Sequence, residues 1–256
     1  MKKVWTLLCQ VTYQKVRSSI KKIAMKNSPL SILVVAAHPD DEILGCGGTM
    51  AKHVTKGDEV NVLIMAEGVT SRDSERDREK RENELSELTK AAKIANDIIG
   101  ANSIHLHDFP DNRLDSIDLL DLIITIEFYI NKYQPSIVYT HHRGDVNIDH
   151  KIVHDAVLAA TRPQPGNCVK TLLFFEIASS TEWTPPQSII SFHPNWFIDI
   201  SDTLEIKLQA LEAYVEEMRT FPHPRSIDGI KYLSKWRGAN VGVDSCEAFI
   251  LGRNIL

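Results

Sequence analysis

Residues 31–48 read Ser-Ile-Leu-Val-Val-Ala-Ala-His-Pro-Asp-Asp-Glu-Ile-Leu-Gly-Cys-Gly-Gly. The uninterrupted apolar run at 32–37 is typical of a strand that is buried on both faces. A charged turn follows it, and a helix is predicted over 46–56. The glycines of this stretch lack the G-x-G-x-x-G order of a dinucleotide loop, so we expect them to let the helix pack close to the sheet.

The alternation of short β-branched runs with longer helical stretches continues to the C-terminus. Further strands are predicted at 59–66, 103–107, 136–139, 171–177 and 246–251, with a short extended run at 196–200. Further helices are predicted at 73–99, 116–131, 149–161, 202–218 and 227–237. This order predicts a single α/β domain in which helices flank a mostly parallel sheet, with right-handed crossovers.

Local sequence also predicts how two of the helices begin. The helix at 73–99 has Leu88, Ala92 and Ile99 at helical spacing, and its charged first part, 73–84, is expected to face solvent. Asp202-Thr203-Leu204-Glu205 has the pattern of a capping box, which predicts a helix start at this point.

Composition excludes several classes of protein. With 256 residues, of which 43% are hydrophobic and 25% charged, the chain can bury one sizeable core. No window approaches the roughly 18 apolar residues of a membrane-spanning helix. The four cysteines are far apart without a C-x-x-C pair, which argues against a disulfide framework or a thiolate metal cluster and favours a reducing, cytoplasmic location.

The net charge of −5 is unevenly distributed. Residues 1–30 carry seven Lys or Arg and no acid, which leaves −12 for the rest and excludes a general nucleic-acid binder. We therefore expect a basic N-terminal extension, 1–30, and a main domain, 31–256. Residues 1–28 either bind weakly to an anionic inner membrane surface through Trp5, Leu8, Val11 and the lysines, or form an arm packed on the protein.

The charged turn after the first strand carries the strongest chemical signal. His38-Pro39-Asp40-Asp41-Glu42 lies where the carboxyl end of a parallel strand is expected, which is the usual place for a ligand site. Ionisable side chains crowded there repel one another unless a cation holds them. His38 and Asp41 supply one nitrogen and one oxygen ligand from a single loop.

A second histidine-rich segment, residues 140–150, follows the strand predicted at 136–139 and belongs to the same edge of the sheet. It ends at His150, and His154 lies one helical turn further on, so a rival H-x-x-x-H pair must be considered. Spacing alone does not choose between the two sites. Two histidines and one carboxylate suit Zn²⁺, or Fe²⁺ as the second choice.

With these motifs together, the sequence resembles the PIG-L/LmbE-like family of zinc-dependent N-acetylglucosaminyl de-N-acetylases over about 31–251. The resemblance rests on Ala37-His38-Pro39-Asp40-Asp41-Glu42, Gly45 and Gly47-Gly48, Glu67-Gly68 with Arg72, residues 109–115, and Asn147-Ile148-Asp149-His150. It implies a Rossmann-like fold, with zinc held by His38, Asp41 and His150 and with Asp40 as the base. It leaves His154 as a structural residue of the helix face.

One position departs from the family pattern, because Asn147 stands where better-known members have a histidine that holds the oxyanion or acts as acid. An asparagine amide donates a hydrogen bond but is not an acid at neutral pH. The proton for the leaving amine therefore comes from Asp40 acting twice, which we favour, or from His142 or His223. Asp149 orients a neighbouring ligand or donor, or caps its helix, and the two roles are compatible.

Substrate contacts are expected from loops that follow strands and from the C-terminal part of the chain. The candidates are Arg72, Asp111, Asn112, Arg113, His223 and Arg225. The resulting hypothesis is hydrolysis of the N-acetyl group of an N-acetylglucosamine-type sugar in a small-molecule, glycolipid or sugar-nucleotide substrate. The alternatives are a zinc amidase for a non-sugar amide and a non-catalytic sugar- or nucleotide-binding protein with a structural metal.

Overall fold

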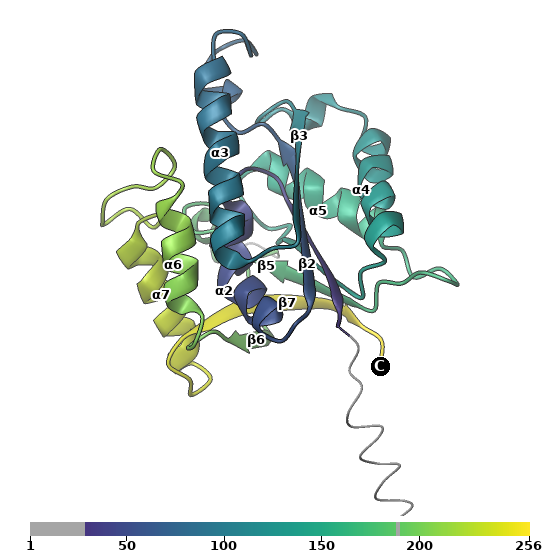
Figure 1. The fold of residues 1–256 in the computed structure, drawn as a ribbon, viewed down its shortest axis with the longest axis vertical. Helices are drawn as coiled ribbons and strands as arrows, with labels where there is room; N and C mark the ends of the chain where they lie inside the picture. Colours follow the sequence, from purple (N-terminus) through teal and green to yellow (C-terminus); the bar gives the residue numbers. More distant parts are fainter. Residues whose placement is uncertain (1–28, 188–189) are drawn as a thin grey trace, which may run out of the picture.

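The computed structural model describes residues 29–187 and 190–256 (Figure 1). The expected extension and its membrane or packed-arm interpretation fall on residues 1–28, outside the described residues. One seven-stranded sheet has the order β3-β2-β1-β4-β5-β7-β6. Its strands are β1 (Ser31–Ala36), β2 (Glu59–Ala66), β3 (Ser103–Phe109), β4 (Ile137–His141), β5 (Thr171–Phe175), β6 (Trp196–Asp199) and β7 (Cys246–Asn254).

The predicted mostly parallel sheet is confirmed. β1 pairs in parallel with β2 and β4, and β4 pairs in parallel with β5. Only β7 runs antiparallel to its neighbours β5 and β6. Because β1, β2 and β4 run in the same direction side by side, the loops that follow them meet at one edge of the sheet.

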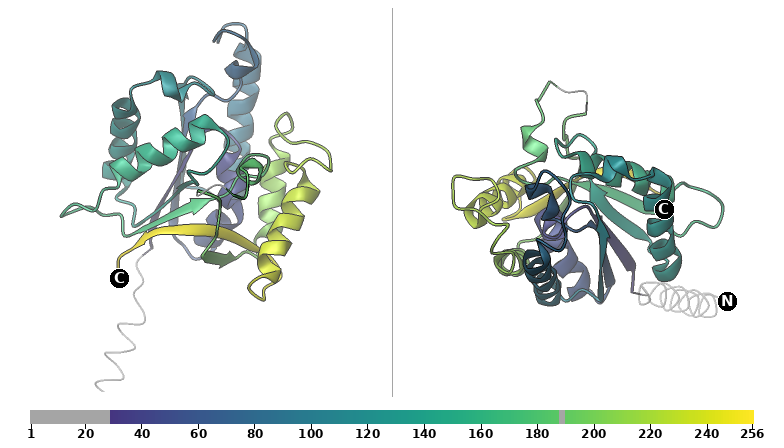
Figure 2. Two further views of the ribbon diagram at one scale, coloured as in Figure 1. Left: turned by 180° about the vertical axis from the view of Figure 1, so that it is seen from behind. Right: turned by 90° about the horizontal axis from the view of Figure 1, so that it is seen from above.

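Helices cover both faces of the sheet (Figures 1 and 2). Along the chain they are α2 (Asp41–Thr55), α3 (Glu82–Ile99), α4 (Leu119–Tyr133), α5 (Ile148–Ala160), α6 (Leu204–Glu212) and α7 (Ile227–Ala239). α2 packs with α3 and α6 on one face, and α4 packs with α5 on the other. Successive β1 residues join two different cores, since Val34 faces the first group of helices and Val35 the second. None of the described helices is long and apolar enough to cross a membrane.

The structure corrects three predicted helix boundaries. α2 begins at Asp41 rather than at 46, so the charged turn supplies its first residues. α3 begins at Glu82, and the charged stretch before it is a loop in which Arg76 binds buried Glu67. The capping box at 202–205 is wrong: Thr203 is the N-cap of α6, its hydroxyl donates to Gly48 O, and α6 ends at Glu212.

The close packing expected of the glycines is present, because a Cβ on Gly45 would lie 2.4 Å from the Phe175 ring. α2 is also broken at Cys46, whose φ and ψ are −148° and 22°. The amides of Gly48 and Thr49, just past this break, donate to the Glu247 carboxylate of β7 at 3.0 and 2.7 Å.

Lys207 of α6 completes the support of the broken helix. Its ammonium donates to Leu44 O at 2.8 Å and to Glu247 Oε1 at 2.6 Å, and both charged side chains are buried. The free carbonyl and amides of the break are thus satisfied by α6 and β7. The Lys207–Glu247 ion pair therefore fixes the part of α2 that directly follows the charged turn.

Lys207→Met should lower the free energy of unfolding by about 3–5 kcal/mol, because it leaves the Glu247 carboxylate buried without its cation. Denaturant titration measures this change. Lys90→Met, which removes the exposed partner of Glu87, is the matched control and should have little effect. Equal small losses in the two variants would contradict the supporting role of Lys207.

Candidate active site and metal centre

Loops from the edge of the sheet and from the C-terminal part of the chain line a cavity of about 200 Å³. The first loop follows β1, two more follow β2 and β3, and a fourth leads from β4 into α5. The segment between α6 and α7 closes the other side. The lining residues are His38, Pro39, Asp40, Asp41, Gly68, Ser71, Arg72, Asp111, Asn112, Asn147, His150, Glu217, Arg219 and Arg225.

The backbone at Asp40 makes the sharp turn that aims two neighbouring carboxylates in different directions. Its φ is +115°, a conformation that costs a residue with a side chain on the order of 1–3 kcal/mol. The Asp40 amide donates to Glu42 Oε2 at 3.1 Å. Glu42 Oε1 accepts from the Tyr214 hydroxyl at 2.6 Å and from Asn96 Nδ2 at 2.9 Å. A buried carboxylate on α2 therefore holds the strained turn.

Burial raises the pKa of Glu42 to about 7, although the hydrogen bonds from Tyr214, Asp40 and Asn96 act in the opposite direction. Glu42 has no water-exposed surface, so these donors are what make its ionised form tolerable. The last acid of the charged turn is thus a structural group behind the cavity rather than part of its lining.

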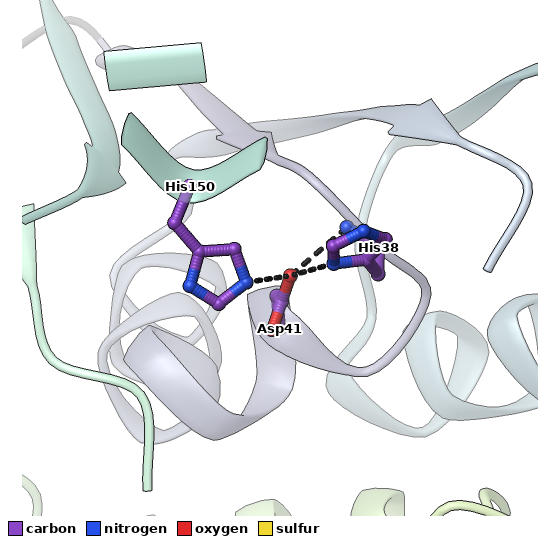
Figure 3. A group of neighbouring side chains, drawn as sticks. All are labelled: His38, Asp41 and His150. Carbon is purple, nitrogen blue, oxygen red and sulfur yellow. Dashed lines mark hydrogen bonds and ion pairs between the residues drawn. The ribbon is translucent and has the colours of Figure 1, made fainter. Parts of the chain in front are cut away.

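His38, Asp41 and His150 line the cavity, and their side chains point toward one another (Figure 3). Asp41 Oδ2 lies 3.2 Å from His38 Nδ1 and 3.2 Å from His150 Nε2. Burial alone would raise the pKa of Asp41, but His150 and His141 hold it well below its usual range. An ionised carboxylate between two imidazole nitrogens is a donor set that Zn²⁺ prefers.

Further carboxylates lie beside the outward nitrogens of both rings. His38 Nε2 lies 3.0 Å from Asp149 Oδ2 and 3.3 Å from Asp111 Oδ1. His150 Nδ1 lies 3.1 Å from Asp145 Oδ2. Carboxylates in this position fix the orientation of metal-binding histidines and direct their other nitrogen at the metal. The arrangement fits a metal at His38 Nδ1, Asp41 and His150 Nε2.

Asp149 joins this support to a neighbouring loop. Its carboxylate accepts hydrogen bonds from Asn112 N at 2.7 Å and Leu114 N at 3.0 Å, in addition to its contact with His38. The alternative in which Asp149 caps its helix is wrong, because Asn147 is the N-cap of α5 and its Oδ1 accepts from the Asp149 amide at 2.8 Å.

A second group, His38, Asp111 and Asp149, also lies close enough to share a cation. It uses the other nitrogen of His38. Its carboxylates already accept from backbone amides, Asp111 from Ser71 and Asp149 from the 112–114 loop. Asp41 Oδ2 likewise accepts from the His38 amide at 2.9 Å, so it is the donor types that favour the first group: two imidazole nitrogens and one carboxylate, against one imidazole and two carboxylates.

Arg225 places its guanidinium against Asp40. Its Nη1 lies 2.9 Å from Asp40 Oδ2, and its Nε donates to Ser179 Oγ at 3.1 Å. Burial raises the pKa of Asp40 well above its ordinary value, and the positive charge of Arg225 opposes that shift. Arg225, expected among the substrate contacts, therefore also favours the ionised form of the carboxylate.

The structure brings several other predicted residues to the same cavity. Arg72 lines it with its guanidinium paired to Glu217 at 2.6 Å. Asp111, Asn112 and Asn147 also line it, and Asn147 Nδ2 donates to Asn112 Oδ1 at 3.0 Å.

Four predicted or rival residues are held elsewhere. Arg113 donates to Asp73 O and Ser74 O, and His142 Nε2 donates to Ile190 O at 2.7 Å. His223 Nδ1 accepts from the Arg225 amide at 3.1 Å. His154 donates to His141 O at 2.8 Å and packs on the Phe174 ring, outside the metal-ligand groups found among the described residues.

Sequence reasoning missed residues that the fold brings to the site. Asp145 lies in the second histidine-rich segment, residues 140–150. Only its distance of 3.1 Å to His150 Nδ1 shows that it can orient this ring. Glu217 and Arg219 carry no motif, since they come from an irregular stretch after α6. The ion pair of Glu217 with Arg72 spans 145 positions and leaves no local pattern.

A family model described as PIG-L, GlcNAc-PI de-N-acetylase, matches residues 33–161. The chain belongs to this family. The matched region contains His38, Asp41 and His150, whereas Arg225 lies beyond it. The PIG-L match therefore covers the edge of the sheet that carries the metal-ligand group.

Individual relatives agree with this assignment. The uncharacterized deacetylase YaiS of Escherichia coli (strain K12) is 31% identical over 199 residues, which cover 75% of this chain and 94% of YaiS. The diacetylchitobiose deacetylase of Thermococcus kodakarensis is 28% identical over 203 residues, 73% of this chain and 70% of that protein.

A solved structure shows the same fold. The conserved protein TT1542 from Thermus thermophilus superimposes with a TM-score of 0.67 at 25% identity and covers 89% of this chain and 96% of its own. The expected single-domain α/β fold with a mostly parallel sheet is therefore confirmed, and TT1542 shares it.

Proposed function

We propose that this protein is a metal-dependent de-N-acetylase that removes the acetyl group from an N-acetylglucosamine-type sugar and releases acetate. The observation that carries the proposal is the convergence of His38, Asp41 and His150 in a cavity that also contains Asp40. Membership of the PIG-L family and the diacetylchitobiose deacetylase relative support an acetamide of a sugar as the substrate. Residues 31–256 form the deacetylase domain in this proposal, and 1–30 its basic extension.

His38, Asp41 and His150 hold the metal, for which Zn²⁺ is the first choice and Fe²⁺ the second. In such a site Zn²⁺ acidifies water and polarises an amide carbonyl. Asp149 and Asp145 keep the two imidazoles oriented. The three-residue set leaves open the side that faces the cavity, where an acetamide can enter.

Asp40 acts as the base in this proposal. Its carboxylate takes a proton from water as the water oxygen adds to the acetamide carbon, and it returns that proton to the sugar nitrogen as the carbon–nitrogen bond breaks. Arg225 stabilises the carboxylate before proton uptake. Asn147 Nδ2 lies at the cavity and donates a hydrogen bond to the developing oxyanion.

Asp40 acting twice remains preferable to a histidine acid. His142 is engaged with the Ile190 carbonyl and His223 accepts from the Arg225 backbone, and neither lines the cavity. The sugar hydroxyls then meet Arg72, Asp111 and Asn112. Of the three arginines around the cavity, Arg72 is paired with Glu217 and Arg225 with Asp40, whereas Arg219 donates to backbone carbonyls. Arg219 therefore favours a substrate that carries an anionic group next to the sugar, such as a sugar nucleotide or a phosphorylated glycolipid.

Two alternatives retain the same metal site. A zinc amidase would act on a non-sugar amide, and a non-catalytic sugar- or nucleotide-binding protein would use the metal only for structure. A buried carboxylate held by an arginine beside the ligands favours catalysis, since a structural metal needs no base. The widely separated cysteines, of which those described are free, support a cytoplasmic location.

The proposed ligands predict how metal content responds to substitution. His38→Ala, Asp41→Ala and His150→Ala should each lower bound zinc sharply, because each removes one of three ligands. His154→Ala is the matched control on the same helix and should leave the metal in place. Elemental analysis of the purified variants decides. Metal loss in the His154 variant with retention in the His150 variant would mean that the wrong histidine was chosen.

Asp40→Asn should separate binding from chemistry. The amide keeps the shape of the side chain but cannot take a proton, so turnover should fall by about 10²-fold or more while the metal stays bound. Asp115→Asn, a change at an exposed carboxylate outside the cavity, is the control. Deacetylation by the Asp40 variant at the parental rate would assign the base to another group.

Acetate release from a panel of substrates tests the reaction itself. The panel contains N-acetylglucosamine linked to phosphate, nucleotide and neutral aglycones, together with N-acetylated amino-acid amides. We expect the highest kcat/KM for an anionic N-acetylglucosamine conjugate and no release from the peptide-like amides. A preference for the non-sugar amides would establish the amidase, and metal binding without any acetate release would establish the binding protein.

A further inference from the structure

α4 has an apolar outer face that nothing among the described residues covers. Leu120, Ile124 and Phe128 recur every fourth residue and are 62%, 54% and 60% exposed. The opposite side of the helix, with Leu122 and Ile126, is buried against the sheet. We call Leu120, Ile124 and Phe128 the α4 stripe. Three large apolar side chains aligned on one helix face indicate a surface that binds a partner.

Acidic residues flank the α4 stripe. Residues 115–133 contain Asp115, Asp118, Asp121 and Glu127 and one cation, Lys132. Arg162, which follows α5, adds a second cation 4.0 Å from Glu127, so the acidic excess lies at Asp115, Asp118 and Asp121. An anionic lipid surface would be repelled by this charge, whereas a basic and partly apolar partner would be attracted. The surface chemistry therefore points to a cationic amphipathic segment.

The chain itself contains such a segment. Residues 1–28 carry seven Lys or Arg and no acid. Their apolar residues Cys9, Tyr13, Val16, Ile20 and Ile23 are spaced by four, three, four and three, which predicts one continuous face of a helix. Residues 1–28 thus combine an apolar face that can contact the α4 stripe with positive charges that complement the acidic residues beside it.

This segment joins the described part of the chain beside α4. Ser31 Oγ donates to Tyr133 O at 2.8 Å, and Tyr133 is the last residue of α4. A helix from Cys9 to Ile23 would have the same 15 residues as α4, so each would span about 22 Å. The lengths match, and residues 24–30 remain to connect Ile23 to β1 at Ser31, beside the end of α4.

We propose that residues 1–28 pack as an amphipathic helix along α4, in the same direction, with the face of Cys9 to Ile23 on the α4 stripe. The basic residues then lie near Asp118, Asp121 and Glu127. This placement makes the N-terminal segment an arm of the protein's own fold rather than a membrane anchor. It is independent of the proposed deacetylase activity.

Disulfide trapping tests the placement in the full chain. Cys9 falls near the N-terminal end of α4, so Leu120→Cys should form an intramolecular disulfide with it on mild oxidation, and Cys9→Ser should abolish the product. Ile94→Cys, at a similarly exposed apolar position on α3, is the matched control and should give none. A disulfide between two chains instead would overturn the proposal in favour of a second copy as the partner. Absence of any product would overturn it as well.

A thermodynamic cycle provides a second readout. Deleting 1–28 should lower Tm by about 2 °C or more in the parent. It should have little effect once Leu120→Gln, Ile124→Gln and Phe128→Gln have removed the apolar contact. Ile94→Gln with Ile98→Gln is the control and should leave the effect of the deletion intact. An equal loss of Tm on deletion in the parent and in the α4-stripe variant would contradict the proposal.

A vesicle experiment tests the membrane alternative. If the full chain sediments with phosphatidylserine vesicles, the deletion variant does not, and no disulfide forms, the segment is a membrane anchor and the proposal fails.

Discussion

The buried Glu42 carboxylate holds the turn on which the site depends. It accepts a hydrogen bond from the amide of Asp40, whose φ of +115° is an unfavourable conformation for a residue with a side chain. Tyr214 and Asn96 in turn donate hydrogen bonds to Glu42. Because of this turn, consecutive acids serve different purposes. Asp40 faces Arg225, while Asp41 faces His38 and His150.

The rest of the fold supports this turn from both ends. A buried β1 strand delivers the chain to the edge of the sheet, and α2 carries it away through a break that Glu247 and Lys207 satisfy. The parallel neighbours β2 and β4 bring further loops to the same edge. The histidines and acids lie at this edge because the strands run in the same direction. The carboxylates of Asp149 and Asp145 orient the rings of His38 and His150.

The sequence predicted the parts of this arrangement that have local patterns. Apolar runs marked the strands, and His38 and Asp41 stood out because charged residues rarely crowd at the end of a buried strand. Spacing left His150 and His154 open, and only the family resemblance favoured His150. In the structure Asp41 Oδ2 lies 3.2 Å from His150 Nε2, whereas His154 belongs to neither metal-ligand group among the described residues. The start of α3 was wrong because the Arg76 and Arg78 side chains bind Glu67, so tertiary ion pairs override helical propensity at 73–81. Arg225 on Asp40 spans 185 positions and leaves no signal in the sequence.

Anomalous diffraction at the zinc absorption edge, from crystals of the protein grown with Zn²⁺, tests the central claim most directly. The account predicts one strong peak between His38 Nδ1, Asp41 Oδ2 and His150 Nε2, on the side that opens to the cavity. A peak on the other side of the His38 ring, among Nε2, Asp111 and Asp149, would contradict it, as would zinc bound only at His154 or at the surface.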